Sequence, residues 1–222
     1  MKITILTLFP QMFKGPFDFS IIKRAIEDKK IQINLVDIRE FGEGKHKVVD
    51  DKPYGGGIGM VLRVDVLERV INSVKDGKLN KDEERIILTS ASGKTYNQTK
   101  AKEYSNLKHL IIICGHYEGV DERIMEFVDE EISIGDFVLT GGEIPAMLIA
   151  DSVARLVPGV LKEGATKLES FSDDSLEHPQ YTRPENFKGL KVPEVLVSGN
   201  HGKIEEWKKA ESLKKTKRNK SN

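Results

Sequence analysis

Two glycine-bearing stretches mark places where a ligand could approach the main chain. The stretch "CGHYEGVDER" spans residues 114–123, and "SIGDFVLTGGE" spans residues 133–143. Glycine in such a loop lets the backbone come close to a ligand or adopt a positive φ. The second stretch also holds two carboxylates, Asp136 and Glu143. It could therefore be a nucleotide-binding turn, a catalytic carboxylate pair or a buried strand with tight ends.

Standard motifs do not decide among these interpretations. The glycines of 55–59 are not followed by the later glycine of a dinucleotide fingerprint, because Met60 and Leu62 stand there, and no GxxxxGK[ST] occurs. The five histidines are scattered, and no Cys/His pairs have zinc spacing, so the sequence predicts no metal site. No nucleophile elbow marks a serine hydrolase.

Alternating elements predict the fold that carries these loops. Continuous apolar, β-branched runs indicate strands covered on both faces, as in a parallel sheet, over 2–9, 31–38, 85–90, 109–115 and 131–139. Helical patterns fall between or after them, over 20–29 with Ser20 as N-cap, 64–75, 97–106, 121–130 and 143–159. Residues 1–160 are thus expected to form an α/β domain, whose ligands bind beyond the carboxyl ends of the strands.

The rest of the chain has a different character. Residues 161–178 show no sustained period and are expected to be an interdomain linker, followed by a small helical domain over 179–222. The last sixteen residues carry seven cations and one anion. Such a basic helix can follow a phosphate backbone, although a solvated helix end has the same composition.

Cysteine content and hydropathy limit the setting of the protein. Cys114 is the only cysteine, which excludes an intrachain disulfide and suggests a reducing compartment. The first apolar run is too short for a signal peptide, and no run approaches the roughly 18 apolar residues of a membrane span. We expect a cytoplasmic protein with no membrane partner. Lys+Arg and Asp+Glu both number 35, so overall charge indicates no partner.

Five long blocks carry a resemblance to a known family: "DDKPYGGGIGM" (50–60), "CGHYEGVDER", "SIGDFVLTGGE", "DSVARLVPGVL" (151–161) and "HPQYTRPENFKG" (178–189). With "LTLFPQMF" (6–13), they make nearly the whole chain resemble the bacterial tRNA (guanine-N1)-methyltransferases. That family methylates N1 of the guanosine just 3′ of the anticodon, at position 37, with S-adenosylmethionine as donor. The resemblance implies the SPOUT fold, with a deep trefoil knot in a mostly parallel α/β domain. It also implies a homodimer whose active sites use both chains.

The same resemblance implies roles for individual residues. Asp173 is expected to be the general base for N1, with Asp174 as its rival, and Arg155 the partner of guanine O6 or a phosphate. The family depends on Mg²⁺, and since no carboxylate cluster predicts a dedicated site, any ion is expected to be held weakly near the substrate. The basic helix would hold the tRNA backbone through Lys208, Lys209, Lys214 and Lys215. Two loops would hold the cofactor inside the knot through Gly115, Tyr117, Glu118, Gly119, Ile134, Gly135, Asp136, Phe137, Val138, Leu139, Gly141 and Gly142.

Departures from the family pattern and two alternative functions accompany this interpretation. The stretch "LTSASGK" (88–94) lacks the usual proline and is one residue longer, and His116 stands where arginine is common. One alternative is a knotted methyltransferase acting on another RNA position, such as a ribose 2′-oxygen, but the block around Asp173 argues against it. The other is an RNA-binding protein without activity, against which the intact glycine loops count.

Overall fold

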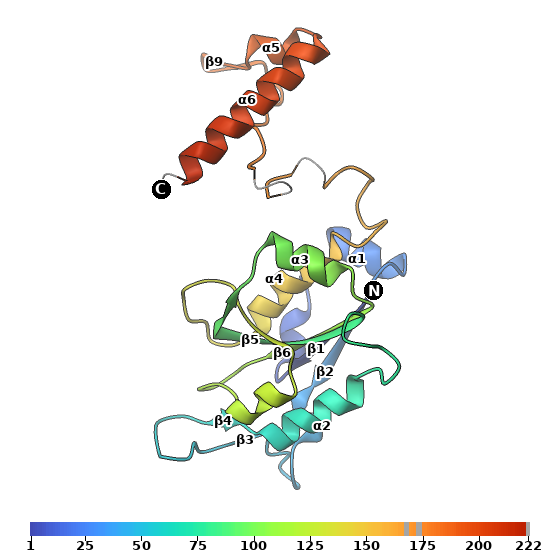
Figure 1. Ribbon diagram of the computed structural model, residues 1–222, viewed down its shortest axis with the longest axis vertical. Coiled ribbons are helices and arrows are strands. Elements are labelled where there is room, and N and C mark those ends of the chain that lie inside the picture. The colour runs from blue at the N-terminus through green and yellow to red at the C-terminus, as the bar shows by residue number, and fades with distance from the viewer. Residues whose placement is uncertain (167–168, 172–174, 221–222) are drawn as a thin grey trace. The chain divides into compact units, whose positions relative to one another are not determined.

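The computed structural model describes residues 1–166, 169–171 and 175–220. The chain forms two compact units, Met1–Leu161 and Lys162–Asn222 (Figure 1). The expected division into a domain, a linker and a second domain at residues 160 and 178 stays a prediction. In the part of the chain that the structure describes, no helix is both long and apolar enough to cross a membrane.

All five apolar runs become strands of one sheet in the first unit. Every pairing in this sheet is parallel, which confirms the expected α/β class. The continuous apolar character of the runs follows from burial on both faces, since alternate residues of one strand enter opposite cores. The strand order is β2 (Gln32–Asp37), β1 (Lys2–Thr7), β6 (His109–Cys114), β5 (Glu84–Thr95) and β7 (Glu130–Ser133).

Helices cover the two faces of the sheet (Figure 1). Leu110 and Ile112 of β6 pack in one core with residues of α1 (Ser20–Glu27), α3 (Gln98–Ser105) and α4 (Glu143–Ala154). Ile111 and Ile113 pack in the other core, against α2 (Val64–Val74) and the 3₁₀ helices η2 (Ile38–Phe41) and η3 (Glu122–Glu126). A further 3₁₀ helix, η1 (Pro10–Phe13), follows β1 and contributes Phe13 to the first core.

Several local expectations are wrong, among them the helix over 143–159, which ends at Ala154. The segment 121–130 contains the 3₁₀ helix η3 and not the expected α-helix, because Asp129 already pairs with Ile86 of β5. The N–H of Asp129 donates to the carbonyl oxygen of Ile86 at 2.9 Å, and the Asp129 carboxylate accepts from the N–H of Ile86 at 2.9 Å. Ser20 is the first residue of α1, so the N-cap is Phe19, which forms no side-chain capping hydrogen bond. The strand expected over 131–139 ends at Ser133, and the chain turns at the following glycine with φ +151°.

The sheet is irregular where β5 meets β7. Thr89 and Lys94 of β5 both pair with Ile132 of β7, so residues 90–93 form a bulge between them. A Cβ on Gly93 would lie 2.5 Å from the carbonyl carbon of Glu131, which explains glycine at this crossing. The bulge lies within "LTSASGK", the stretch in which the sequence departs from the family pattern.

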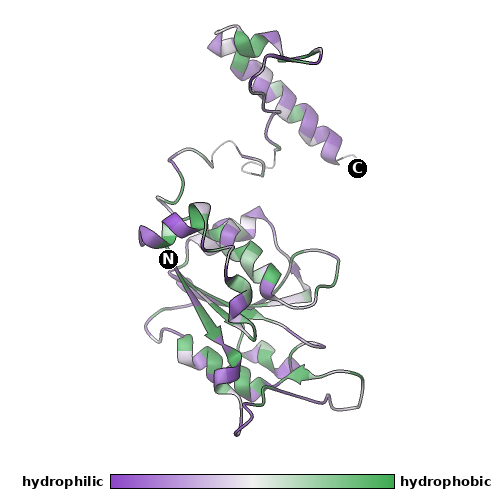
Figure 2. Cartoon of the chain, turned by 180° about the vertical axis from the view of Figure 1, so that it is seen from behind, coloured by the Kyte–Doolittle hydropathy of each residue, from purple (hydrophilic) through white to green (hydrophobic). Residues whose placement is uncertain are grey.

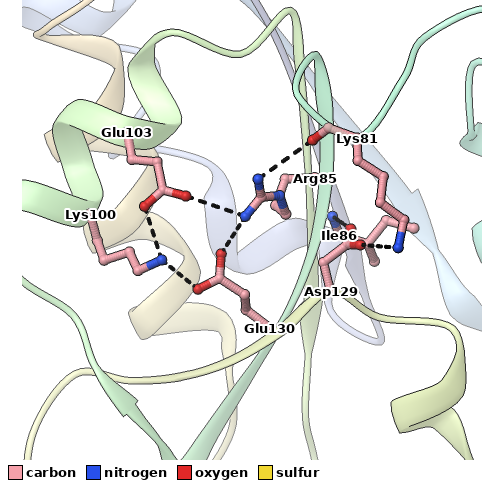
Figure 3. Close-up of polar contacts among 7 residues, drawn as sticks. All are labelled: Lys81, Arg85, Ile86, Lys100, Glu103, Asp129 and Glu130. Carbon is pink, nitrogen blue, oxygen red and sulfur yellow. Dashed lines mark hydrogen bonds and ion pairs between the residues drawn. The ribbon is translucent and has the colours of Figure 1, made fainter.

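Four charged side chains join β5, α3 and β7 at the other end of this pairing (Figure 3). Glu130 of β7 accepts hydrogen bonds from Arg85 of β5 at 2.7 Å and from Lys100 of α3 at 2.6 Å. Glu103 accepts from the same two donors at 3.2 and 2.9 Å. Burial alone would raise the pKa of the Glu130 carboxyl, but the hydrogen bonds from Lys100 and Arg85 outweigh burial and hold the pKa below its ordinary value. The start of β7 is thus anchored to β5 and α3.

The second unit has its own small set of contacts. Its elements are the hairpin of β8 (Asn186–Phe187) and β9 (Leu190–Lys191), α5 (Glu194–Val197) and α6 (His201–Lys220). Figure 2 shows α6 as mostly hydrophilic. Trp207 of α6 contacts the rings of His178 and Tyr181 at centroid distances of 6.3 and 6.2 Å. Leu176 donates its N–H to the Thr216 hydroxyl at 2.9 Å. Residues 176–181 are thus attached to α6.

Glu130→Gln should lower the free energy of unfolding at pH 7 by about 1–3 kcal/mol, because two cations lose their charged partner in a half-buried network. Because the pKa of Glu130 is lowered in the folded protein, its contribution to the free energy of unfolding is fully present above pH 4.5, the ordinary pKa. That contribution is lost as pH falls through the lower folded-state pKa. Urea unfolding between pH 3 and 7 should therefore show a weaker acid dependence in the variant than in the wild type.

Glu27→Gln is the matched control. Glu27 pairs with Lys23 four residues earlier at 3.8 Å, and both side chains are more than half exposed. Its loss should change stability by less than about 0.5 kcal/mol. Equal effects of the two substitutions would contradict a special role for the network in Figure 3.

Candidate active site

A cavity of about 440 Å³ opens beyond the carboxyl ends of β6 and β7 and beside the bulge of β5. The carboxyl ends of the strands are where parallel α/β proteins bind their ligands. Four segments form most of the cavity wall: 88–92 within β5, 115–120 after β6, and 131–134 and 137–142 at and after β7. The structure therefore brings together the two glycine-bearing stretches 114–123 and 133–143.

Ten of the twelve expected cofactor-binding residues line this cavity. Gly135 and Asp136 do not. A Cβ on Gly135 would lie 2.5 Å from the ring of Phe137, so this glycine makes room for an aromatic ring that does line the cavity. Asp136 is exposed. The ten lining residues are Gly115, Tyr117, Glu118, Gly119, Ile134, Phe137, Val138, Leu139, Gly141 and Gly142.

Gly142 lies where the chain passes the ends of two strands. Its N–H donates to the carbonyl oxygen of Gly115 at 2.7 Å. A Cβ at this position would lie 2.7 Å from both the Cα of Cys114 and the N of Gly115, so no side chain fits. This close passage is consistent with the knot that the resemblance implies, and it positions the first turn of α4 behind the cavity.

The charge of the cavity wall has one sign. Its charged side chains are Glu118, Glu122 and Glu131, and neither lysine nor arginine is among the lining residues, all of which the structure describes. Glu131 accepts a hydrogen bond from the Ser92 hydroxyl at 2.9 Å. Such a wall favours a ligand that carries positive charge and disfavours phosphate groups.

Buried polar groups lie behind the glycine loops. Glu143, which is 2% exposed, accepts a hydrogen bond from the Thr7 hydroxyl at 2.8 Å, and this hydroxyl accepts from the N–H of Phe9 at 2.9 Å. Burial raises the pKa of the Cys114 thiol well above its ordinary value, so this cysteine is not a reactive thiolate. The buried Nδ1 of His116 has no hydrogen-bond partner within the described chain. Since Glu143 is buried and Asp136 exposed, the two acids of "SIGDFVLTGGE" do not form a catalytic pair.

The residues expected to act on tRNA lie elsewhere. Arg155 caps the C-terminal end of α4, whereas Gly142 and Pro145 at the N-terminal end border the cavity. Asp173 and Asp174 lie outside the described residues. The four lysines are on α6, where Lys208 pairs with Glu205 at 2.8 Å and Lys214 with Glu211 at 2.6 Å. Lys209 and Lys215 are exposed.

Several lining residues had no role expected from the sequence, among them Thr89, Ser90, Ser92 and Glu122. Thr89 is buried and donates its hydroxyl to the carbonyl oxygen of Ile113 at 3.0 Å, which ties β5 to β6. The available signal was the position of 88–92, which spans the end of the apolar run 85–90, because parallel strands end at a ligand site. No group of three or more His, Cys, Asp or Glu in the described residues is arranged to hold a metal ion.

Comparisons of the sequence with known proteins identify its family. Residues 1–222 match the family described as "tRNA (Guanine-1)-methyltransferase TrmD". The tRNA (guanine-N(1)-)-methyltransferase of Bacillus pumilus (strain SAFR-032) is 57% identical over 220 residues, which cover 97% of this chain and 88% of the relative. Those of Carboxydothermus hydrogenoformans and Listeria innocua are 55% and 53% identical over 218 residues each, with 97% of this chain and 84% and 89% of the relatives covered. The chain therefore belongs to the tRNA (guanine-1)-methyltransferase family.

Proposed function

We propose that this protein transfers a methyl group from S-adenosylmethionine to N1 of the guanosine just 3′ of the anticodon, position 37, in tRNA. The observation that carries the proposal is the acid-lined, glycine-walled cavity at the carboxyl end of the parallel sheet, in a chain that belongs to a family of this activity. Bound there, S-adenosylmethionine would supply the methyl as an electrophilic carbon on a positively charged sulfur.

The lining residues fit this cofactor. Its sulfonium and ammonium groups are cationic, and the only charges on the wall are carboxylates. The glycine-bearing segments 115–119 and 134–142 bring main chain to the cavity wall, where an adenine could meet backbone groups, while Phe137, Val138 and Leu139 offer apolar surface. A nucleoside triphosphate would meet repulsion in the same place, which separates this site from a nucleotide-hydrolysing one.

Guanine N1 carries a proton at neutral pH, so the reaction requires a base within hydrogen-bond reach of N1 and a donor near O6. We assign the base to Asp173, by the family pattern of "SFSDD", and the O6 or phosphate contact to Arg155. The carboxylate of Asp173 would take the N1 proton, and the guanidinium of Arg155 would stabilise the negative charge that develops on O6.

The position of Arg155 supports a shared active site. Within one chain, Arg155 lies ten residues beyond Pro145, which borders the cavity, or about 15 Å farther along the helix. A second copy of the chain could supply the arginine instead. The exposed face of α4 fits such a contact, because Ile144 and Leu148, four residues apart, remain 51% and 44% exposed, whereas the other apolar residues of the helix are buried or half-buried. We therefore propose a homodimer in which Arg155 acts at the partner's cavity.

The second unit would hold the tRNA. Between His201 and Lys220, α6 carries eight Lys/Arg and three Glu, and phosphate contacts from such a helix position the substrate without reading its sequence. Lys209 and Lys215 are the better candidates for these contacts, because Lys208 and Lys214 are already paired with glutamates. The proposal includes Mg²⁺ held weakly beside the RNA and a cytoplasmic location.

The purified protein should methylate a tRNA transcript that has guanosine at position 37 and at the preceding position. Replacement of the guanosine at position 37 by adenosine should abolish methyl incorporation, because the base that receives the methyl is gone. Mass-spectrometric mapping of the product checks the position. A methyl found on a ribose, on another base or nowhere would contradict the proposed function.

Asp173→Ala should lower turnover by about 10²–10⁴-fold, the usual contribution of a general base, and leave the affinity for S-adenosylmethionine unchanged. Single-turnover kinetics and calorimetry measure the two quantities. Asp174→Ala is the matched control and should retain most activity. The opposite result would move the base to Asp174, and equal retention of activity would remove both residues from the proton transfer.

Mixing two inactive variants should restore activity if active sites are shared. Arg155→Ala keeps an intact cavity, and Glu118→Lys keeps Arg155 but places a cation in the cavity wall. After subunit exchange, about a quarter of the sites of a symmetric dimer should combine an intact cavity with an intact arginine. Turnover of each variant alone at the same total concentration is the control. An absence of recovery in proven mixed dimers would show that each chain uses its own Arg155.

A further inference from the structure

The hairpin over residues 50–62 lies against the cavity loop that follows β6. Its strands are β3 (Asp50–Asp51) and β4 (Val61–Leu62). The N–H of Glu118 donates to the carbonyl oxygen of Met60 at 3.1 Å, and the N–H of Leu62 donates to that of Gly119 at 3.1 Å. A parallel bridge between Leu62 and Val120 continues this contact. The main chain of the hairpin is therefore held in register with the cavity wall.

Gly59 is the point at which the hairpin touches a cavity side chain. A Cβ on Gly59 would overlap Glu118, with its Oε1 at 2.6 Å and its Cδ at 2.9 Å. The carboxylate thus lies over a space that exists only because residue 59 has no side chain. The Glu118 side chain is exposed, and Gly59 leaves the room that this side chain occupies beside the hairpin.

Backbone conformation alone does not explain this glycine. Gly55, Gly56, Gly57 and Gly59 all have positive φ, and the hairpin needs glycine there for its turn. At Gly55 (φ +86°), however, an added Cβ would meet nothing within 4 Å, whereas at Gly59 (φ +95°) it would meet Glu118. The two positions share the same backbone requirement and differ in their contact with the cavity.

We propose that Gly59 is a positioning residue that holds the Glu118 carboxylate in place, and that Glu118 selects the positively charged cofactor over its uncharged thioether product. The inference rests on the proposed function, since it assumes that S-adenosylmethionine occupies the cavity. Methyl transfer breaks the bond between the methyl carbon and sulfur, and the bonding electrons remain on sulfur. The sulfonium thus becomes a neutral thioether, and a fixed carboxylate beside the ligand loses its attraction for sulfur at that moment.

Calorimetric affinities for S-adenosylmethionine and S-adenosylhomocysteine test this inference. The Glu118 carboxylate should strengthen the binding of S-adenosylmethionine but not that of S-adenosylhomocysteine. Glu118→Gln should therefore lower the ratio of the first affinity to the second by about tenfold. Gly59→Ala should lower the ratio in the same direction, because a Cβ displaces the carboxylate. The double variant should lose little more than either single variant, because both remove one interaction.

Gly55→Ala is the matched control. It imposes the same strained φ on the same hairpin but touches nothing, so the ratio should remain at the wild-type value. Equal weakening of both ligands by Gly59→Ala would show a structural effect only, and an unchanged ratio in Glu118→Gln would remove the carboxylate from cofactor selection. If the wild type bound neither ligand, the proposed function itself would be wrong, which is a different outcome from an unchanged ratio.

Discussion

The main chain at Gly142 passes so close to Thr89 of β5 and to the end of β6 that no side chain fits between them. Three segments meet at this point, because Gly142 donates to Gly115 while the Thr89 hydroxyl donates to Ile113. The passage determines where α4 begins and directs the loop 134–141 along the cavity. A larger residue at this position would separate the strand ends and open the wall. The ligand site therefore depends on a steric constraint in the backbone and not on a particular polar side chain.

Sequence patterns predicted the elements whose cause is local and missed those whose cause is tertiary. The five strands could be predicted from the sequence, because burial on both faces requires continuous apolar residues whichever partners they meet. Positions 110–113 of β6 are an example. The helix expected over 121–130 failed because Asp129 pairs with Ile86, a contact that no local pattern reveals. The bulge in β5 and the space over Gly59 depend on segments far apart in the sequence, so no spacing rule could locate them.

The same limit applies to the candidate site. Glycines indicated where the chain allows close approach, and the structure brings those loops together in one cavity. The negative charge of the wall could not be predicted, because Glu118, Glu122 and Glu131 come from a loop, a 3₁₀ helix and a strand and are mixed in the sequence with cations that do not line the cavity. The assignments of Asp173 and Arg155 rest on the family pattern, since neither residue has a periodicity or spacing that marks it for chemistry.

Opposite charges in the two units suggest how one protein could sort two very different ligands. The cavity wall carries only carboxylates, whereas α6 carries eight Lys/Arg against three Glu. A tRNA backbone would be attracted to α6 and repelled by the cavity, so a nucleoside could approach the cavity with its uncharged base but not with its phosphates. A cationic cofactor would show the reverse preference. Charge alone would thus keep each ligand from occupying the other's site, and the selection would require no hydrogen bond to a specific atom of either ligand.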